Sequence, residues 1–503
     1  MKIYKYLMLF IFTGGLLTSC ANDDMDDVPG QSELPGEEPK DDLQLEIRDF
    51  EYKAMDVWYY YNDDMAIYED DFFADQSELN DWLMDWDSPE DLFYDGLLLN
   101  YPVTDRFSWI VDDYEELENM FAGTTTSTGM DYGITRVCAE CNELILYVRY
   151  VIPNTPAEDA GIKRGMVFTE INGTELNVNN YTDLLASDSY TLTLGKIEND
   201  GISTTENTID VSKTTVDENP VLVAKTIDLS GTKVGYIMYN SFTFNYSGAL
   251  NDAFGQFKSE NVTELILDLR YNGGGRIDTS IDLASMITGQ FDDQPFVKFQ
   301  YNDYIQSVYQ NQGSDLTISM DDTVNWQNSS APTNSLNLNK VYIIATGSSA
   351  SASELVMNGL EPFIDVIHIG TKTVGKVQGS DTYYDSTAPN FDKTAAINPN
   401  HKYAIQPLIL SLVNKNNEAY PGGLVPDFEQ QEFISTYGVL GDPNEPLLSL
   451  ALDQIDPTRS ANRTIKEGII PTEMISERKA FQHDYQRMYI ESENIKTNSN
   501  SVE

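Results

Sequence analysis

The chain has 503 residues, of which 81 are acidic and 31 are basic, so its formal net charge is −50 at pH 7. A surface this negative repels phosphate backbones, which argues against nucleic acid as a partner. Hydrophobic residues make up 41% of the chain. That fraction supports a sizeable core, and the length corresponds to about three domains of ordinary size.

The N-terminus indicates the compartment. Residues 1–19 read as a secretory signal, because Lys2 and Lys5 precede an apolar run too short for a stable spanning helix. Small residues directly before Cys20 resemble a bacterial lipobox, which implies cleavage there and lipid on its sulfur; the alternative is an ordinary signal peptide. The acidic "ANDDMDD" that follows resembles the surface-export signal of Bacteroidetes lipoproteins. We therefore expect a protein of the cell envelope, lipid-anchored to the outer membrane, on the periplasmic face or the cell surface.

Residues 20–42 are acidic and rich in proline and glycine, a composition typical of a disordered tether. Residues 43–125 favour a small helical domain. "DSPEDLF" predicts the start of one helix, with Ser88 as the N-cap and Pro89 at the first helical position. A longer helix is predicted from apolar residues whose spacing places them on one face: Phe50, Ala54, Val57, Trp58, Tyr61 and Met65.

Residues 126–212 change to a β-rich pattern. Cys138 and Cys141 stand in "VCAEC", between two expected strands. A metal site would need two further ligands, and no Cys or His motif supplies them, so no metal is predicted. A redox motif would instead lie at the start of a helix after a strand. A local disulfide or two free thiols are expected.

The stretch "VIPNTPAEDAGIKRGMVFTEINGTEL" (151–176) resembles a PDZ domain. Its residues predict a short helix closed by Gly161 and a hairpin turn at Asn172-Gly173. PDZ domains bind an extended peptide as an added strand and hold its terminal carboxylate on backbone amides. The alternative is a module that only braces the fold. By the resemblance, the carboxylate loop would lie near Tyr132, Gly133 and Ile134.

From residue 213 to 440, expected strands alternate with expected helices, which argues for an α/β core. Apolar strands are predicted at 233–242, 263–270 and 340–347. Residues 441–503 are expected to form helical segments and a polar tail, and they carry no motif. The predicted class is thus an α/β multidomain protein: a helical N-terminal domain, a β-rich PDZ domain and an α/β catalytic core.

"KVYIIATGSSASASELVMNGL" (340–360) predicts a strand, a turn of small residues and a helix. A serine between strand and helix lies at a helix N-terminus, where free amides and the helix dipole favour a developing negative charge. The neighbouring alanines leave room for a substrate carbonyl. This setting suits a nucleophile, and the candidates are Ser349, Ser351 and Ser353.

A nucleophilic serine needs a proton acceptor. Lys376 follows Gly375 among apolar valines, and burial can lower a lysine pKa by up to about 3–5 units, so that the neutral amine can act as a base. The alternative is a solvated surface lysine. Lys372 is a competing base, and His368 stands in an apolar run that is typical of a core residue.

Four motifs occur in order over residues 268–427: "DLRYNGGG", "SASASE", "GTKTVGK" and "GGLVPD". Behind a PDZ-like segment, they resemble the C-terminal (tail-specific) processing peptidases, a Ser–Lys family. The resemblance implies Ser351 as the nucleophile and Lys376 as the base, 25 residues apart as in the family. The oxyanion hole would be formed by the amide of Ala352 and by that of Gly273 or Gly274.

The sequence departs from the family pattern after the lysine. Val377 stands where glycine is frequent. Ser380 stands where many members carry a glutamine that orients the lysine, and Gln378 is two residues too early. The third catalytic residue is therefore left open.

The sequence thus predicts a membrane-anchored serine endopeptidase that acts on protein or peptide substrates, without a metal or organic cofactor. Two alternatives stay open. One is a catalytically inactive peptide-binding scaffold of the same fold. The other is a Ser-His-Asp hydrolase that uses His401 and Asp427. The oligomeric state is not indicated.

Overall fold

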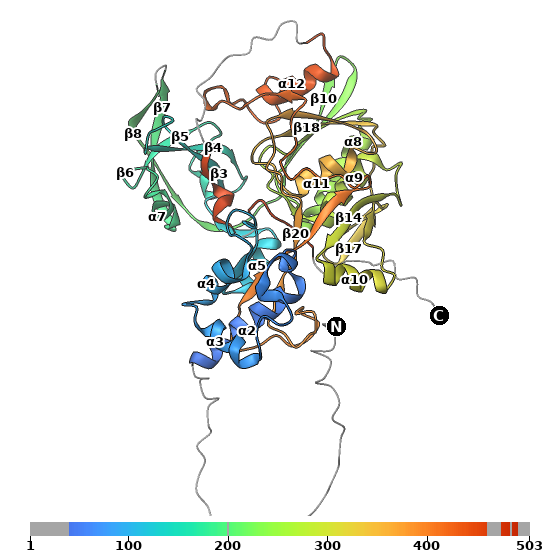
Figure 1. Cartoon of the computed structure of the whole chain (residues 1–503). Coiled ribbons are helices and arrows are strands. Elements are labelled where there is room, and N and C mark those ends of the chain that lie inside the picture. Colours follow the sequence, from blue (N-terminus) through green and yellow to red (C-terminus); the bar gives the residue numbers. More distant parts are fainter. Residues whose placement is uncertain (1–39, 199–200, 460–473, 483–484, 491–503) are drawn as a thin grey trace, which may run out of the picture.

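The computed structural model describes residues 40–198, 201–459, 474–482 and 485–490. The chain is a mixed α/β, multidomain protein with a helical N-terminal region and several sheets, so the predicted fold class is confirmed (Figure 1). The predicted signal segment, Cys20 and nearly all of the tether lie outside the described residues. Within the described ranges, no helix is long and apolar enough to cross a membrane.

The N-terminal region consists of short helices packed through aromatic side chains. The Ser88 hydroxyl caps its helix as predicted and accepts the Asp91 amide at 3.0 Å. The first helix is shorter than predicted and ends at Trp58, because the Tyr60 amide donates to the Leu408 carbonyl at 2.8 Å. The last two residues of the predicted stripe therefore lie beyond it. The elements are α2 (Lys40–Trp58), η2 (Asn62–Asp64), η3 (Ala66–Tyr68), α3 (Gln76–Met84), α4 (Pro89–Asp91), η4 (Leu92–Leu97) and α5 (Tyr114–Phe121).

A separate antiparallel sheet with two short helices follows, and we call it the β lobe. As predicted, Asn172 and Gly173 form a hairpin turn of the lobe, both with positive φ. Cys138 and Cys141 form a disulfide at another turn. The lobe contains β3 (Met130–Arg136), β4 (Leu144–Val151), α6 (Pro156–Asp159), β5 (Val167–Ile171), β6 (Thr174–Glu175), α7 (Tyr181–Ala186), β7 (Ser189–Glu198), β8 (Gly201–Ser212) and, from far along the chain, β25 (Met474–Glu477).

The α/β core is built on a six-stranded sheet that is parallel except at one edge strand. Its order is β10 (Val221–Leu229), β11 (Thr232–Tyr239), β12 (Glu264–Asp268), β18 (Lys340–Ala345), β19 (Asp365–Gly370) and β24 (Phe428–Glu429). One face packs against α8 (Ser247–Ser259), α9 (Ile277–Thr288) and α11 (Ala352–Leu360), and the other against α12 (Pro446–Ile455). Strands covered on both faces are apolar along their length, which makes them recognisable in the sequence.

A second six-stranded sheet and a three-stranded sheet complete the core region. The second sheet runs in the order β13 (Gly275–Arg276), β26 (Met488–Tyr489), β20 (Gln378–Ser380), β23 (Leu408–Asn414), β14 (Pro295–Tyr301) and β15 (Thr317–Ser319). The smaller sheet runs β1 (Trp109–Val111), β22 (Ala404–Gln406), β21 (Tyr383–Tyr384). The remaining elements are β2 (Thr124–Ser127) paired with β9 (Thr214–Asp217), β16 (Thr323–Trp326) paired with β17 (Ser329–Pro332), α10 (Asp303–Asn311), η5 (Phe244–Tyr246), η6 (Ile434–Thr436) and η8 (Arg478–Phe481).

The C-terminal region differs from the predicted helical segments and tail. α12 is helical, but the described residues after it include the strands β25 and β26. These two strands join two different sheets, the β lobe and the second sheet. A strand of two to four residues has too few side chains to show a period, and its partners are hundreds of residues away. The local sequence therefore gives no sign of either strand.

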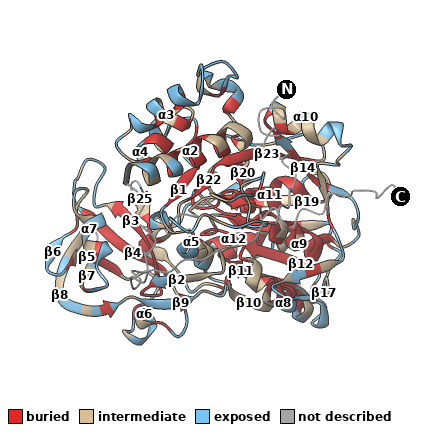
Figure 2. Ribbon diagram, turned by 90° about the horizontal axis from the view of Figure 1, so that it is seen from below, coloured by how far each residue is buried: buried red, intermediate tan, exposed pale blue. Residues whose placement is uncertain are grey.

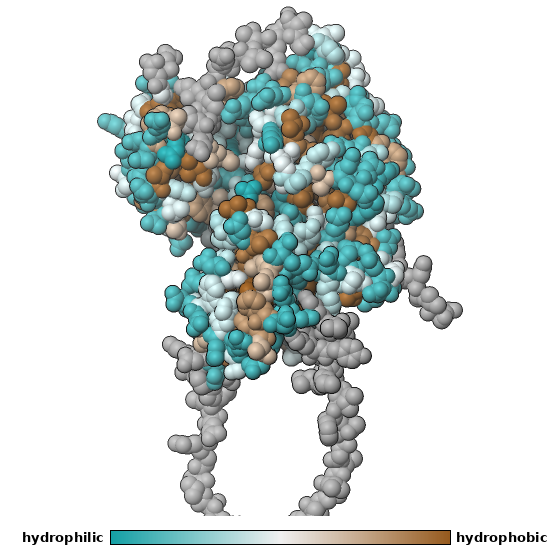
Figure 3. Space-filling model, in the orientation of Figure 1, coloured by the Kyte–Doolittle hydropathy of each residue, from teal (hydrophilic) through white to brown (hydrophobic). Residues whose placement is uncertain are grey.

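Burial follows this architecture. Buried residues gather in the strands and on the inner faces of the helices, whereas much of α3 and of β8 is exposed (Figure 2). Figure 3 shows mostly hydrophilic residues on the face turned to the viewer, with hydrophobic residues in smaller patches. Such a surface agrees with the large net negative charge.

Candidate active site

Ser351 lies where strand β18 leads into helix α11. It is the N-cap residue of α11, with φ of 64° and ψ of −117°, a conformation that residues with a side chain rarely adopt. A strained turn between strand and helix is typical of a serine nucleophile, because it presents the hydroxyl at the helix N-terminus. The side chain is fully buried, and its hydroxyl has no hydrogen-bond partner of normal geometry among the described residues.

The two neighbouring serines of the motif are engaged in the fold. The Ser349 hydroxyl donates to the Leu269 carbonyl at 2.7 Å, and the Ser353 hydroxyl donates to the Asn272 carbonyl at 2.9 Å. Both acceptors belong to the loop that follows β12, so these serines hold two loops together. Of the three hydroxyls, that of Ser351 is the one left available for chemistry.

Glu354 joins the Ser351 turn to the lysine loop. Its carboxylate accepts the amides of Ser351 at 2.8 Å and of Lys376 at 2.9 Å. It also accepts the Gly375 amide at 2.6 Å and the Thr373 hydroxyl at 2.5 Å. Burial raises the pKa of Glu354, and these hydrogen bonds act in the opposite direction.

No positioning role was predicted for Glu354, although part of the signal is in the sequence. Ser351 and Glu354 are spaced as a capping box, Ser-x-x-Glu at a helix start. The bonds from Glu354 to the lysine loop depend on tertiary structure, so no local pattern predicts them.

Lys376 is buried, with 1% of its surface exposed, and its Nζ has no hydrogen-bond partner among the described residues. Burial lowers the pKa of Lys376 well below its usual value, and the positive charge of Arg487 adds to this; Asp105 and Glu354 act against it. Lys376 therefore favours the neutral amine, the form that can accept a proton from a serine hydroxyl.

An aromatic ring from the N-terminal region, that of Phe107, lies against the lysine amine. The Lys376 Nζ lies 4.8 Å from the centroid of the Phe107 ring. The Asp105 carboxylate fixes this segment by accepting the amides of Phe107 and Ser108, each at 2.9 Å, and the Tyr59 hydroxyl, also at 2.9 Å. The helical region thus contributes to the dry environment of the catalytic candidate.

Two glycines let the lysine loop cross a neighbouring segment, backbone against backbone. Gly375 has φ of +91°, and a Cβ there would lie 2.4 Å from the Gly423 nitrogen. Gly423 has φ of +82°, and a Cβ there would lie 2.2 Å from the Thr373 carbonyl oxygen. The motifs "GTKTVGK" and "GGLVPD" therefore form one crossing that holds Lys376 in place.

Ser351 and Lys376 line the same cavity, together with Glu354 and Met488. Its volume is about 20 Å³, which is room for roughly one water molecule and no more. A buried serine hydroxyl and a buried lysine amine thus share a site at a helix N-terminus.

The predicted oxyanion donors lie beside the serine. A Cβ on Gly274 would lie only 2.8 Å from the Ser351 Cβ, so this close approach requires glycine. The Gly274 amide, however, donates to the Asn272 side chain at 2.9 Å and is not available to an oxyanion in this structure. Of the two predicted glycine donors, this leaves Gly273. Ala352 is the first residue of α11, where an amide has no partner within the helix.

Residues 233–409, which contain both Ser351 and Lys376, match the sequence profile described as Peptidase family S41. The α/β core is thus similar to family S41. The family predicted from the four motifs is thereby confirmed for this part of the chain.

Relatives show the same similarity. The chain is 23% identical over 267 residues to the chloroplastic C-terminal processing peptidase of Tetradesmus obliquus, and 25% identical over 271 residues to the carboxyl-terminal-processing protease of Picosynechococcus sp.. The matched parts are 51% and 53% of this chain, and 52% and 58% of the relatives, so the chain spans little more than half their length. A crystal structure of a candidate S41 protease from Bacteroides fragilis shares the fold, with a TM-score of 0.58 at 24% identity, over 81% of this chain and 97% of that chain.

Neither residue considered for the third catalytic position forms a hydrogen bond with the Lys376 amine. The Gln378 side chain donates to the Tyr61 hydroxyl at 3.2 Å, and the Ser380 hydroxyl donates to the Met488 carbonyl at 3.2 Å. The structure therefore provides no side-chain orienter for the lysine among the described residues. Glu354 holds its backbone amide instead.

The alternative with a catalytic histidine is wrong, because the structure does not bring its members together. His401 Nε2 lies 3.0 Å from the Asp385 carboxylate. Asp427 instead accepts the backbone amide of His368 at 2.8 Å. The His368 side chain faces the Ala345 carbonyl at 3.3 Å, as a core residue would. His401, Asp385, Asp427 and His368 are all absent from the lining of the cavity that holds Ser351 and Lys376.

The residues predicted to bind a peptide carboxylate lie apart from this cavity, in the β lobe. Tyr132, Gly133 and Ile134 are strand residues of β3 rather than a loop. Each is paired with β4, and Gly133 and Ile134 are paired on the other side with β25. Lys372, the competing base, is exposed and does not line the cavity.

Proposed function

We propose that the protein is a serine endopeptidase that resembles the C-terminal processing peptidases and cleaves peptide bonds by Ser–Lys acyl transfer. One observation supports this most: the hydroxyl of Ser351 and the amine of Lys376 are buried, lack hydrogen-bond partners of normal geometry among the described residues and line one cavity at a helix N-terminus. A buried polar group without a hydrogen bond lowers the stability of the fold. Two such groups in one cavity therefore favour a chemical role.

In the proposed acylation step, the Ser351 oxygen attacks the carbonyl carbon of the substrate, and its proton passes to the neutral Lys376 amine. The charged oxygen of the tetrahedral intermediate binds the amide of Ala352 at the start of α11 and the amide of Gly273 in the loop after β12. The C–N bond then breaks, and Lys376 returns its proton to the leaving amine. The acyl group stays on Ser351.

In deacylation, a water molecule attacks the ester carbonyl, and Lys376 takes one of its protons. When the C–O bond to Ser351 breaks, that proton returns to the serine oxygen. The chain ends the cycle with a free hydroxyl and a neutral lysine, and no residue changes its oxidation state. Glu354 acts as a positioning residue, because it holds the backbone of both catalytic residues.

We further propose that the β lobe is a PDZ module that gathers the C-terminal ends of protein or peptide substrates on β3. The hairpin turn at Asn172-Gly173 and the short helix α6 support the resemblance. We also propose that Cys20 carries a lipid that holds the enzyme at the outer membrane, on its periplasmic face or at the cell surface, since the lipobox-like "LTSC" precedes an acidic segment.

A fluorophosphonate probe and a fluorogenic peptide test the proposal together. Wild type should be labelled at Ser351 and should hydrolyse the peptide, whereas Ser351→Ala should do neither. Ser349→Ala is the matched control and should be labelled, since the Ser349 hydroxyl is engaged with backbone groups, donating to the Leu269 carbonyl and accepting the Thr346 amide. Equal labelling of wild type and Ser351→Ala would contradict the assignment. A folded wild type without labelling or hydrolysis under any condition would favour the inactive scaffold.

A further inference from the structure

Residues 474–490 run from the β lobe to the active site, and the structure describes 474–482 and 485–490 of this C-terminal segment. The segment first forms β25, then the turn η8, and finally β26. In Figure 2, β25 lies beside β3 at the inner side of the lobe. The segment therefore follows a path between the two places where a peptide substrate would bind under the proposed function.

At the lobe, β25 occupies the edge of β3 as an added antiparallel strand. Ser476 is paired with Ile134, and Glu477 with Gly133. This is how a PDZ module receives a peptide, by backbone pairing along a strand edge. The segment thus fills the edge on which the resemblance places the peptide ligand.

Buried charges fasten this part of the segment. Glu477, 4% exposed, forms an ion pair with Arg149 of the lobe and accepts the Ser348 hydroxyl at 3.1 Å. Ser348 stands three residues before the catalytic candidate, so Glu477 links the lobe to the nucleophile loop. Burial raises the pKa of Glu477, but Arg149 and the hydrogen bonds outweigh it and lower the pKa.

Arg478, the next residue, is also held by ion pairs. Arg478, 7% exposed, bonds Asp131 of β3 at 3.0 Å and Glu218 at 2.8 Å. Lys479 donates to the Asn240 carbonyl at 2.6 Å. Charged groups this well buried and paired mark a specific docked position.

At the active site, the segment lies directly on the glycine loop. The Arg487 carbonyl accepts the Gly275 amide at 2.9 Å, and a Cβ on Gly274 would lie 2.7 Å from that same oxygen and 2.8 Å from the Ser351 Cβ. A Cβ on Gly273 would lie 3.2 Å from the Gln486 nitrogen. The backbone of the segment therefore lies against the glycine loop that includes Gly273, one of the two proposed oxyanion donors.

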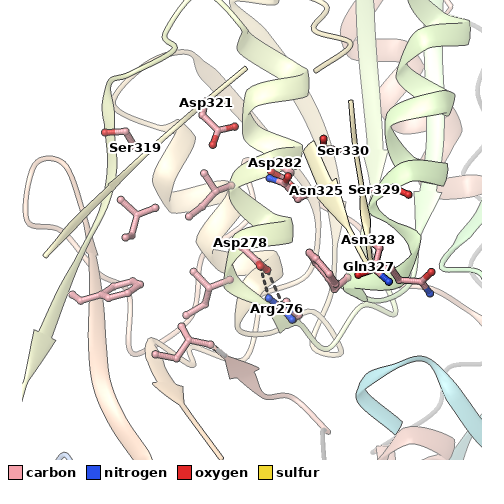
Figure 4. Close-up of a pocket in the computed structure, with 16 residues that line it drawn as sticks. Arg276, Asp278, Asp282, Ser319, Asp321, Asn325, Gln327, Asn328, Ser329 and Ser330 are labelled. Atoms are coloured by element: carbon pink, nitrogen blue, oxygen red, sulfur yellow. Dashed lines mark hydrogen bonds and ion pairs between the residues drawn. The ribbon is translucent and has the colours of Figure 1, made fainter. Parts of the chain in front are cut away.

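Beyond this point the segment continues as β26, between β13 and β20, and Met488 closes the cavity of Ser351 and Lys376. Ile490 then lines a separate cavity of about 500 Å³ (Figure 4). Figure 4 shows carboxylates of Asp278, Asp282 and Asp321 among its walls, with Arg276 paired to Asp278. The segment thus connects the β3 edge, the small catalytic cavity and a cavity with room for side chains.

We propose that the described parts of this segment, residues 474–482 and 485–490, are an intramolecular peptide ligand that occupies the substrate path and holds the enzyme in an inhibited state. This inference rests on the proposed peptidase function. With the segment in place, the Ser351 side chain is 0% exposed and its cavity admits about one water molecule. A substrate therefore reaches Ser351 only after the segment leaves.

A reversible lock tests the inference. Thr135 and Met474 are directly paired across β3 and β25, so Thr135→Cys with Met474→Cys should form a disulfide that keeps the segment docked. We expect fluorophosphonate labelling of Ser351 to be about tenfold slower in the oxidised double variant than in wild type, and to recover on reduction. Wild type with the same reductant is the control, because it also loses the Cys138–Cys141 disulfide.

A release variant tests the same inference from the other side. Arg478→Gln removes a charge that is paired only while the segment is docked, so labelling of Ser351 should be about tenfold faster than in wild type. Lys196→Gln, an exposed lysine of the lobe far along β7, removes the same charge and should label as wild type does. Limited trypsin digestion reports docking separately, since cleavage after Lys479 and Arg487, which both variants keep, should be faster in Arg478→Gln and slower in the oxidised lock.

The outcomes separate the inference from the proposed function. Faster labelling on release and slower labelling in the lock support it. Equal labelling rates in the locked, wild-type and released proteins would overturn the inhibition and leave the peptidase proposal standing. A segment that opens to trypsin while Ser351 reacts in none of the three proteins would overturn the peptidase proposal, and the inhibition with it.

Discussion

Arg270 and Lys376 are both almost completely buried, with 0% and 1% of their surfaces exposed, yet their surroundings are opposite. The Arg270 guanidinium is paired with Asp268 at 2.7 Å, with Glu445 at 2.7 Å and with Glu432 at 2.9 Å. The Lys376 amine has no partner among the described residues. The first cation belongs to a saturated network, and the second stands beside an equally unpartnered serine.

This difference indicates a structural role for Arg270 and a chemical role for Lys376. Arg270 follows β12 and fixes the start of the glycine loop, so its charge is fully used in the folded state. Burial would raise the pKa of Glu432, but Arg270 and Arg164 outweigh it and lower the pKa to about 2. Lys376 receives no such compensation, so its pKa falls and it favours the neutral form. A buried cation without a partner destabilises a fold, which favours a role in catalysis.

Removing the amine should have the largest effect. Lys376→Met keeps the volume of the side chain and removes the proposed base, so kcat/KM should fall by about 10²- to 10⁴-fold, the range of general base catalysis. The free energy of unfolding should stay within about 1 kcal/mol of wild type, because an apolar side chain suits the site. Peptide hydrolysis and urea denaturation measure the two. Activity near the wild-type level would rule out a lysine base.

The matching change on the other cation should affect stability. Arg270→Met leaves Asp268 and Glu445 buried without their partner, which should lower the free energy of unfolding by about 3–5 kcal/mol. Urea denaturation followed by circular dichroism measures this loss. If Arg270→Met and Lys376→Met were equally stable, the ion pairs of Arg270 would contribute no more to stability than the unpaired amine of Lys376.

The two cations should also differ in their response to pH. In the unfolded chain Lys376 binds a proton up to about pH 10.4, whereas the folded chain releases it at lower pH, so the unfolded state binds more protons between the two pKa values. Relative to Lys376→Met, the free energy of unfolding should therefore rise with pH across that window, by at most about 1.4 kcal/mol per unit. Activity should rise through the lower pKa. Arg270 stays charged throughout and contributes no such slope. A flat difference between wild type and Lys376→Met would mean that Lys376 is not buried neutral.

Much of the core could be predicted from the sequence, because its signals are local. The buried strands β11, β12 and β18 are continuous apolar runs, and the turn to α11 carries its small residues and the capping-box spacing. Local signals also explain why Ser351 and Lys376 could be predicted. A nucleophile and a base can be recognised from short motifs because each motif shapes its own loop.

The contacts between distant segments could not be predicted. The aromatic ring against Lys376 comes from Phe107, some 270 residues earlier, and the bonds of Glu354 to the lysine loop need both loops in place. The strand β25 pairs with residues more than 300 positions away. The His401 alternative failed for the same reason, since only the fold shows that Asp385 is its partner. In each case the decisive neighbour is set by tertiary packing.

Glu354→Gln should have a smaller effect on stability than Arg270→Met. The carboxylate accepts three backbone amides, and a glutamine would turn its own N–H group toward one of them. We expect a loss of about 1–3 kcal/mol in the free energy of unfolding and a fall in kcat with KM little changed, since the residue positions Ser351 and Lys376. Glu198→Gln, which changes an exposed carboxylate of the β lobe, is the control. A change in KM alone would contradict the positioning role.

The smallest effects should come from the two serines that flank Ser351. Ser353→Ala removes one buried hydrogen bond to the loop after β12 and should cost about 1 kcal/mol of stability. Ser349→Ala removes the bond to the Leu269 carbonyl and the bond from the Thr346 amide, so it should cost about 1–2 kcal/mol. Both should keep most of the activity, because the loop is still held by the Arg270 network and because the Ser351 hydroxyl is untouched. Denaturation midpoints and kcat/KM for the same peptide measure both quantities. If either alanine variant remained folded but lost activity as completely as Ser351→Ala, its hydroxyl would take part in the chemistry. The presence of a hydrogen-bond partner would then no longer distinguish structural from catalytic hydroxyls at this site.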